Sequence, residues 1–199
     1  VWLHAAPMFH LADGGAIAST TMLGATHAYL PTFDPEAFLQ AVERYRVTET
    51  VLVPTMINMI VNHPKAGAYD LSSLERFLYG ASPMPLPVLR RAMELLPNVR
   101  FRQGYGMTEA GPLLLALLHE DHRLERLEEK FTPIKSAGRP IYGVEVRIVD
   151  ERDREVPVGQ SGEIIVRGGA VMKGYWKRPE VTAEVMRGGW LHTGDIARM

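Results

Sequence analysis

The sequence contains no cysteine among its 199 residues. This absence excludes a disulfide scaffold, a thiol nucleophile and a metal site built on thiolates, and it is compatible with a reducing cytoplasm. An excess of charge of one sign is also missing, because 22 Lys and Arg nearly balance 23 Asp and Glu to give a net charge of -1. No overall field draws such a protein to nucleic acid or to an anionic membrane, so we expect neither as a partner.

Long apolar runs are absent as well. No stretch approaches the roughly 20 apolar residues of a membrane span, and no basic region with an apolar core opens the chain as a signal peptide would. We therefore predict a cytoplasmic protein without a transmembrane segment. The chain opens at Val1 inside an apolar run and stops at Met199, just after the patterned segment "WLHTGDIARM", so we expect a fragment of a longer chain.

Strand-like and helix-like segments alternate over residues 1–118. The expected strands are "VWLHAA", "THAYLP", "ETVLVP", "RFLYGA" and "VRFRQGY", and the expected helices are residues 11–23, "DPEAFLQAVERYR", "TMINMIVNH" and "PLPVLRRAMELLP". In the second of these helices Asp34 is a plausible N-cap, Pro35 the first helical residue, and Phe38, Val42 and Tyr45 share one face. Repeated units of this kind predict an α/β domain with a mainly parallel sheet and helices on both faces.

The composition and the residue pattern change after residue 118. Residues 119–130, "HEDHRLERLEEK", form a charged connector, typical of a solvated helix or linker. Residues 131–199 then carry the strand-like runs "VEVRIVD", "GEIIVRG" and "WLHTGDI", with turn residues in "ERDREVPVGQSG". They predict a small antiparallel β-sheet or barrel-like subdomain, so the expected domain limits are 1–118 and 131–199.

Two glycine-containing turns, "YGASP" and "QGYGMTE", follow predicted parallel strands. Ligands of open α/β sheets bind beyond the carboxyl ends of the strands. There Gly80 and Gly104 would let a flat ligand lie against the backbone, and Tyr105 could stack on a base. Thr108 offers a hydroxyl to a phosphate, and Glu109 a carboxylate of the kind that Mg²⁺ uses beside substrate phosphates. These parts suit a nucleotide.

A structural interpretation of the same stretch is equally open from the residues alone. The glycines could simply make a turn, Tyr105 could fill the core, and Thr108 with Glu109 could begin a helix. Several familiar motifs are excluded: the chain has no G-x-x-x-x-G-K-[ST], no third glycine of a dinucleotide fingerprint, and no second glycine flanking Ser82 as in a hydrolase elbow. "HEDH" also has the wrong spacing for two zinc ligands on one helix face.

Six motifs together resemble the adenylate-forming superfamily of acyl-CoA synthetases, luciferases and peptide-synthetase adenylation domains. They are "PMFH", "YGASPMP", "QGYGMTE", "SAGRP", "GEIIVRGGAVMKGYW" and "GGWLHTGD", in the order of that family and at about its spacing. The resemblance implies an AMP-forming acid–thiol ligase that condenses a carboxylic acid with ATP to an acyl-adenylate and passes the acyl group to CoA. It also implies ATP or AMP, Mg²⁺ and CoA as the small molecules bound.

The resemblance also implies roles for single residues. Glu109 is similar to the Mg²⁺ ligand and Thr108 to the phosphate-contacting hydroxyl, so these two are the expected catalytic residues. Tyr105 is similar to the adenine-stacking ring and Asp195 to the carboxylate that accepts both ribose hydroxyls. From the residues alone Asp195 is an ordinary turn aspartate after Gly194. The other expected nucleotide-binding residues are Gly80, Ala81, Ser82, Gln103, Gly104, Gly106 and Met107.

The acid pocket is predicted with less support from the residues themselves. The resemblance implies that His10 lies near the substrate carboxylate and is linked to gating, although a single histidine at a strand end is more often structural. Thr55, Met56, Gly80, Pro112 and Leu113 would line an acyl pocket, with ordinary core packing as the alternative.

The departures from the family pattern shape the remaining expectations. The phosphate-binding loop that the family carries upstream and the lysine-bearing C-terminal domain both lie outside these 199 residues. We therefore expect the isolated chain to bind nucleotide weakly and to be inactive. Fatty acids are the first expectation for the substrate, aryl acids stay open, and a non-catalytic nucleotide-binding or interaction module is the alternative of another class. The oligomeric state, with a homodimer among the options, is not determined by the sequence.

Overall fold

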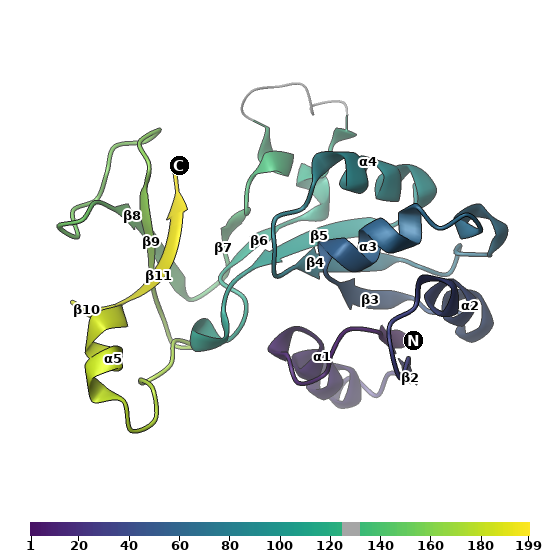
Figure 1. Ribbon diagram of the computed structural model, residues 1–199, viewed down its shortest axis with the longest axis horizontal. Helices are drawn as coiled ribbons and strands as arrows, with labels where there is room; N and C mark the ends of the chain where they lie inside the picture. Colours follow the sequence, from purple (N-terminus) through teal and green to yellow (C-terminus); the bar gives the residue numbers. More distant parts are fainter. Residues whose placement is uncertain (125–131) are drawn as a thin grey trace. The chain divides into compact units, whose positions relative to one another are not determined.

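The computed structural model describes residues 1–124 and 132–199, so part of the predicted connector, residues 125–130, lies outside the described residues. Before that gap, His119–Asp121 forms a short 3₁₀ helix, η3. The chain divides into two compact units (Figure 1). The first comprises Val1–Tyr105 with Ala116–Gly138, and the second Gly106–Leu115 with Arg139–Met199. The domain limits predicted from the sequence stay a proposal.

The larger sheet has seven strands in the order β2-β1-β3-β4-β5-β6-β7. Its pairs from β2 to β5 are all parallel, as the β-branched and apolar runs predicted. The strands are β1 (Trp2–His4), β2 (His27–Tyr29), β3 (Glu49–Leu52), β4 (Arg76–Gly80), β5 (Arg100–Tyr105), β6 (Leu115–Leu117) and β7 (Arg139–Pro140). The short strands β6 and β7 were not predicted, because two or three residues carry no readable periodicity.

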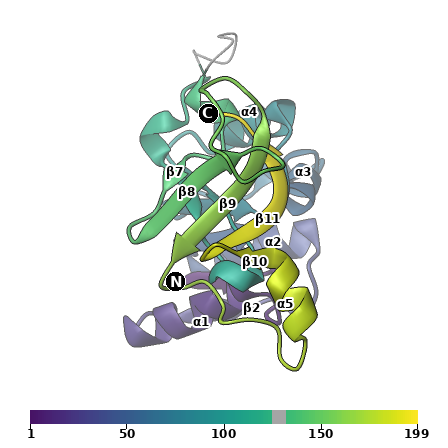
Figure 2. The ribbon, with the colours of Figure 1, turned by 90° about the vertical axis from the view of Figure 1, so that its left-hand side faces the viewer.

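Helices join the parallel strands, and their faces follow from the strand order. The helices are α1 (Leu11–Met22), α2 (Pro35–Tyr45), α3 (Pro54–Val61) and α4 (Leu86–Leu95). Connections between parallel strands are almost always right-handed. Helix α1 connects β1 to β2 in one direction along the sheet, whereas α2, α3 and α4 connect strands in the opposite direction, so α1 covers the opposite face from these three. Figures 1 and 2 show α3 and α4 side by side on one face and α1 away from them. The predicted α/β architecture with helices on both faces is confirmed.

Helix α2 begins where its sequence signals predicted. The Asp34 carboxylate accepts a hydrogen bond of 2.8 Å from the Ala37 amide, and Pro35 is the first helical residue. Phe38 and Val42 are buried in the core of the first unit. Tyr45, one turn further on, is instead 46% exposed, because the helix ends there. Only the first two of the three residues predicted to share a face therefore contribute to the core.

A hydrogen-bonded pair of buried polar side chains lies in the core of the first unit. The ring of His122 donates from Nδ1 to the Leu118 carbonyl at 2.7 Å, and its Nε2 accepts from the Tyr79 hydroxyl at 2.9 Å. A carbonyl only accepts, so the neutral tautomer of His122 is fixed. Burial raises the pKa of Tyr79 well above its usual range and lowers the pKa of His122. Both groups are therefore uncharged at neutral pH, and they anchor the segment around η3 to β4.

The smaller sheet, which Figure 2 shows face on, has four strands in the order β10-β11-β9-β8, and every pair in it is antiparallel. Its strands are β8 (Val144–Val149), β9 (Gly162–Gly168), β10 (Met186–Arg187) and β11 (Trp190–Ala197), which confirms the predicted antiparallel sheet. A short helix, α5 (Pro179–Val185), was not predicted. Trp190 is 8% exposed, with the guanidinium groups of Arg147 and Arg167 each 4.6 Å from the centre of its ring system.

No helix among residues 1–124 and 132–199 is long and apolar enough to cross a membrane.

Candidate active site

Parallel strands β1, β3, β4 and β5 of the first unit end at one edge of the sheet, because each neighbouring pair runs in the same direction. Four segments leave that edge. They are the loop ending at His10, the start of α3 with Thr55, the turn from Gly80 to Ser82, and the end of β5 at Tyr105. The fold thus brings the predicted site residues of the first unit to the edge where open α/β sheets bind ligands.

The strand order also marks a position along this edge. From β1 the chain winds outward to β2, whereas from β3 it winds in the other direction to β4 and β5. The direction of winding therefore reverses between β1 and β3, and ligands of doubly wound sheets bind at such a switch point. His10 and Thr55 follow these two strands, and both side chains are exposed. The topology supports a ligand site beside them independently of any motif.

His10 occupies the N-cap position of α1 with an extended backbone, but its side chain makes no capping hydrogen bond. Its ring lies 4.6 Å from the ring of Phe9, which is itself 86% exposed. The ring of His10 therefore contributes nothing to the start of the helix, which weakens the purely structural explanation of this histidine.

Gly80, the last residue of β4, lies so close to Gly104 near the end of β5 that no side chain fits between them. The two residues are partners in the β4–β5 register, and a Cβ on Gly80 would lie 2.2 Å from the Gly104 carbonyl oxygen. The next residue, Ala81, has a φ of 67°, which is unusual for an alanine and costs on the order of 1–2 kcal/mol. This turn is therefore held in a fixed, strained conformation, and Ser82 after it is exposed.

The segment after β5 carries Thr108 and Glu109 on a 3₁₀ turn, η2 (Thr108–Ala110), in the second unit. A Cβ on Gly106 would lie 2.0 Å from the Pro112 carbonyl oxygen, so only glycine allows the chain to fold back this tightly. Gly111 then ends the turn in the left-handed conformation, with a φ of 71°. Thr108 is exposed, and Glu109 is partly exposed.

Glu109 is bonded through both its main chain and its side chain. Its carbonyl oxygen accepts from the Met172 amide at 2.7 Å, and its Oε1 accepts from the Tyr175 hydroxyl at 2.9 Å. The bond to the carboxylate raises the pKa of Tyr175, since it favours the protonated phenol. Sequence reasoning missed Tyr175, which lies 66 positions from its partner. The quoted motif "MKGYW" contained it without indicating its contact.

Asp195 lies in an irregular part of β11. The β9–β11 register shifts between His192 and Ile196, and Gly194 in this bulge has a φ of 78°. Two hydrogen bonds fix the bulge, from Thr193 Oγ1 to the Ile164 carbonyl oxygen at 2.8 Å and from the Gly194 amide to Glu163 Oε1 at 3.0 Å. The bulge leaves Asp195 exposed. Bulges re-aim side chains, so this geometry argues against an ordinary turn aspartate.

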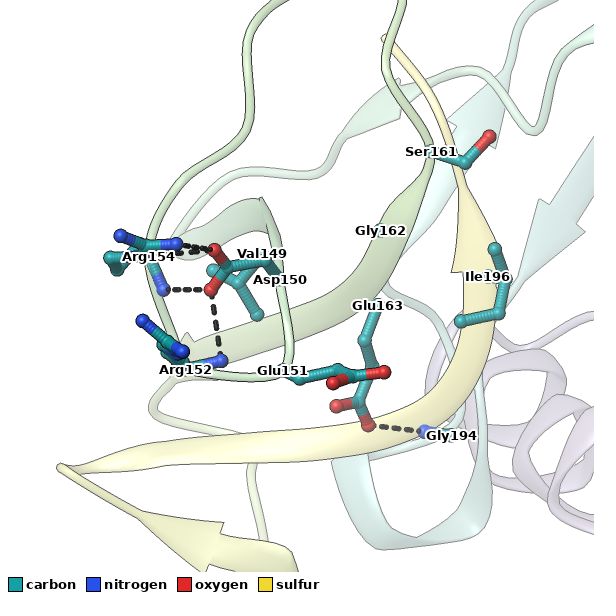
Figure 3. Close-up of a pocket in the computed structure, with 10 residues that line it drawn as sticks. All are labelled: Val149, Asp150, Glu151, Arg152, Arg154, Ser161, Gly162, Glu163, Gly194 and Ile196. Carbon is teal, nitrogen blue, oxygen red and sulfur yellow. Dashed lines mark hydrogen bonds and ion pairs between the residues drawn. The ribbon is translucent and has the colours of Figure 1, made fainter.

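A cavity of about 630 Å³ lies within the second unit (Figure 3). Two of its charged groups are paired with each other, since Arg154 donates to Asp150 at 2.7 and 2.9 Å and lowers the pKa of that carboxyl to about 2. None of the lining residues is among the predicted site residues, although two of them flank Asp195 in sequence. The lining residues are Val149, Asp150, Glu151, Arg152, Arg154, Ser161, Gly162, Glu163, Gly194 and Ile196.

The described residues are compatible with magnesium held together with a substrate. No group of three or more His, Asp or Glu side chains that could hold a metal ion occurs within residues 1–124 and 132–199. Mg²⁺ commonly binds through one or two carboxylates, several waters and substrate phosphates, and does not require a cage of protein ligands. Glu109 has one carboxylate oxygen bonded to Tyr175, and its other oxygen makes no hydrogen bond to a described residue. A single carboxylate of this kind fits that mode of binding.

A buried polar chain near the start of α1 was not predicted. Asp13 Oδ1 lies 2.8 Å from His4 Nδ1 and accepts from Trp2 Nε1 at 3.2 Å, and His4 Nε2 lies 2.9 Å from His27 Nδ1. The side chains of His4 and Asp13 are fully buried. Asp13 is therefore bonded to β1 and is not presented to a ligand.

Comparison with known families identifies the family of the chain. The model of the AMP-binding enzyme family matches residues 1–176. The chain belongs to the AMP-binding enzyme family. This family match covers the strand ends, both glycine turns, Glu109 and Tyr175. Asp195 lies beyond the matched residues, so the role expected for it depends on the motif and on the bulge.

Curated relatives of this AMP-binding family chain include ligases of aryl and of fatty acids. Feruloyl-CoA synthase from an Amycolatopsis species is 45% identical over 196 residues, which are 98% of this chain and 38% of that protein. A medium/long-chain fatty-acid–CoA ligase of Mycobacterium tuberculosis is 36% identical over 197 residues, which are 99% of this chain and 33% of that protein. The chain thus spans 38% and 33% of the length of these two relatives.

Solved structures of the family share the fold along the whole chain. The amide bond synthetase McbA from Marinactinospora thermotolerans is 37% identical with a TM-score of 0.87, covering 100% of this chain and 38% of McbA. The o-succinylbenzoate–CoA synthetase of Bacillus subtilis, solved with ATP and a magnesium ion, is 29% identical with a TM-score of 0.83. It covers 100% of this chain, which spans 39% of that synthetase.

Proposed function

We propose that the protein is an ATP-dependent acid–CoA ligase that activates an aryl carboxylic acid as its acyl-adenylate. The observation that carries the choice of acid is the 45% identity to feruloyl-CoA synthase over 98% of the chain, against 36% to the fatty-acid ligase. This ordering supports an aryl acid over the fatty acid that the sequence alone favoured. Family membership supports the adenylating chemistry itself.

The proposed roles of the first unit follow from its sheet edge. Tyr105, at the end of β5, stacks on the adenine, and the close approach of Gly80 to Gly104 clears the backbone for a flat ring. His10 and Thr55, at the switch point between β1 and β3, contact the acid. An exposed imidazole at that position can hydrogen-bond to a carboxylate and orient it for attack on the α-phosphorus of ATP.

The proposed roles of the second unit concern phosphate and ribose. Thr108 donates its hydroxyl to a phosphate, Glu109 holds Mg²⁺, and Asp195 accepts from the ribose hydroxyls. When bound, Mg²⁺ neutralises the charge that develops on the departing pyrophosphate. The carboxylic acid needs activation because its electron-rich carbonyl is a poor electrophile. Thr108 and Glu109 lower the barrier to adenylation by stabilising negative charge that grows on the phosphates in the transition state. The remaining proposed contacts to the nucleotide and the acid come from Gln103, Ala81, Ser82, Gly106, Met107 and Pro112.

The substrate proposal is tested by product analysis with the full-length protein, Mg²⁺, ATP and CoA. Ferulate, 4-coumarate, benzoate, octanoate and palmitate form a suitable panel, with AMP and the acyl-CoA thioester quantified for each. We expect the highest kcat/KM for a cinnamate-type acid. A higher kcat/KM for octanoate or palmitate would indicate a fatty-acid ligase. If no acid of the panel yields AMP, the ligase proposal is wrong and a non-catalytic nucleotide-binding module is favoured.

A second acceptor is favoured by one specific observation, the similarity to an amide bond synthetase at 37% identity. An acyl-adenylate can be attacked by an amine or by a thiol, with AMP as the leaving group, so the activation step is shared. Repeating the reactions with an alkylamine in place of CoA distinguishes the two. Amide formed in preference to thioester would change the acceptor and leave the adenylation proposal standing.

The cytoplasmic location predicted from the composition stays a prediction.

A further inference from the structure

The hydroxyl of Tyr175 is the side-chain group that holds the carboxylate of Glu109 in the described structure. The phenol donates to Oε1 at 2.9 Å, since a carboxylate can only accept. A hydrogen bond to one oxygen fixes the rotation of the carboxylate and leaves the other oxygen as the freer electron-pair donor. The geometry is that of an outer partner that orients a metal-binding carboxylate.

Tyr175 is itself held in place by the segment around it. Its amide donates to Thr182 Oγ1 at 2.9 Å, and that hydroxyl donates in turn to the Arg178 carbonyl oxygen at 2.8 Å. Gly174 has a φ of 146°, and a Cβ there would lie 2.7 Å from Thr182 Cγ2. This backbone conformation and this close approach both favour glycine at the position. The hydrogen bonds through Thr182 therefore hold the backbone of Tyr175 and pre-position its phenol.

The main chain of the same segment is anchored without the phenol. The Met172 amide donates to the Glu109 carbonyl oxygen at 2.7 Å, and Gly111 packs so closely against Ala170 that an added Cβ would lie 2.9 Å from its Cβ. These contacts secure the 172–175 segment beside η2. The hydroxyl of Tyr175 is thus superfluous for attachment, and its distinct effect is on the orientation of the Glu109 side chain.

We propose that Tyr175 is a positioning residue for the Mg²⁺–ATP complex, acting through the carboxylate of Glu109. The proposal rests on the proposed function, in which Glu109 holds Mg²⁺. Replacement of the phenol by a phenyl ring frees the carboxylate to rotate, so that binding of the metal must order it. The cost falls on metal-bound ATP and leaves metal-free ATP unaffected, because Tyr175 touches neither substrate nor nucleotide in this account.

The test is calorimetric titration of full-length protein with ATP, in excess Mg²⁺ and separately in EDTA, with no carboxylic acid present. For Tyr175→Phe we expect the Kd for the magnesium complex to rise roughly 10-fold, as for other outer partners of metal ligands, with the Kd for metal-free ATP unchanged. Tyr142→Phe is the matched control, since Tyr142 is fully exposed in the same unit, and it should leave both constants unchanged.

A second background separates positioning from general damage. In Glu109→Gln protein the advantage of Mg²⁺ should already be lost, so adding Tyr175→Phe should change neither constant further. Equal weakening of both forms of ATP by Tyr175→Phe, or a full effect in the Glu109→Gln background, would overturn the proposal, as would wild-type constants in the variant. If the wild-type protein binds metal-free and metal-bound ATP equally well, Glu109 does not hold Mg²⁺ and the inference about Tyr175 is wrong as well.

Discussion

At the scale of single residues, the candidate site depends on positions where the backbone leaves no room. Gly80 faces the Gly104 carbonyl oxygen and Gly106 faces that of Pro112, in each case at a distance that no Cβ tolerates. Both glycines precede a residue with a proposed contact to the nucleotide. Their requirement is steric, so it holds whether or not a ligand is bound.

Gly80→Ala should therefore destabilise the protein. The added methyl group would meet a main-chain oxygen at 2.2 Å, so strand β4 or β5 must shift, and we expect a loss of about 1–3 kcal/mol in the free energy of unfolding. Urea unfolding followed by circular dichroism measures the change. Gly15→Ala in α1 is the control, because a Cβ there meets nothing within 4 Å, and it should leave the free energy unchanged or raise it by up to about 1 kcal/mol. Equal effects of the two substitutions would contradict the steric argument.

Glu109→Gln should separate the two half-reactions. Loss of the carboxylate removes a proposed Mg²⁺ ligand that acts on departing pyrophosphate, so adenylation should slow on the order of 100-fold. Thioester formation from a supplied acyl-adenylate needs no pyrophosphate departure and should change little. Single-turnover measurements of each step provide the comparison, and equal losses in both would count against the assigned role.

At the scale of elements, long patterned segments were predictable and short or contact-dependent ones were not. Helix α2 carried its own start signals, and the Asp34 cap appeared as predicted. The parallel strands around β3 carried continuous apolar runs, and the antiparallel sheet was indicated by its turn residues. In contrast, β6, β10 and α5 are too short for a period to be read.

Candidate site residues divide in the same way. The glycine turns and Glu109 could be recognised as motifs, because the residues proposed to bind the nucleotide there are adjacent in sequence. Tyr175 and the Asp13–His4 pair were not, because their bonds join positions that only the fold brings together. Asp195 was ambiguous in sequence, since a bulge and an ordinary turn use the same residues until the register of β11 is known.

The Tyr79–His122 pair, which ties the segment around η3 to β4, predicts a pH dependence of stability. Burial lowers the pKa of His122 below its unfolded value of 6.5, so below about pH 6.5 the unfolded chain binds a proton that the folded chain does not. Stability should therefore fall as the pH drops through 6.5, with a slope of up to about 1.4 kcal/mol per pH unit, and the loss ends below the folded pKa. The neighbouring charges are His119, Glu120 and Asp121.

Urea unfolding at pH 7.5 and pH 5.5 measures this dependence, and His122→Gln is the comparison that isolates it. The variant loses the titrating ring, so the difference in stability between wild type and variant should shrink as the pH falls. A constant difference at both pH values would show that His122 does not titrate on unfolding.

At the scale of the whole molecule, the chain has the fold of the AMP-binding enzyme family and spans only part of the length of its relatives. The AMP-binding family model matches residues 1–176, and the chain spans 38% of the feruloyl-CoA synthase it resembles. Within that span the sheet edge supplies proposed contacts to acid and adenine, and the second unit supplies those to phosphate and ribose. The account therefore predicts a complete adenylation step only for the full-length protein.

Activation of an aryl acid by adenylation is measured separately from thioester formation by exchange of radiolabelled pyrophosphate into ATP. The full-length protein is incubated with Mg²⁺, ATP and ferulate, without CoA, so that only the reversible first step runs. The account predicts exchange that requires ferulate, exceeds that with palmitate, and falls on the order of 100-fold in Glu109→Gln. Exchange that is absent with every carboxylic acid, or that proceeds equally without any acid, would contradict it.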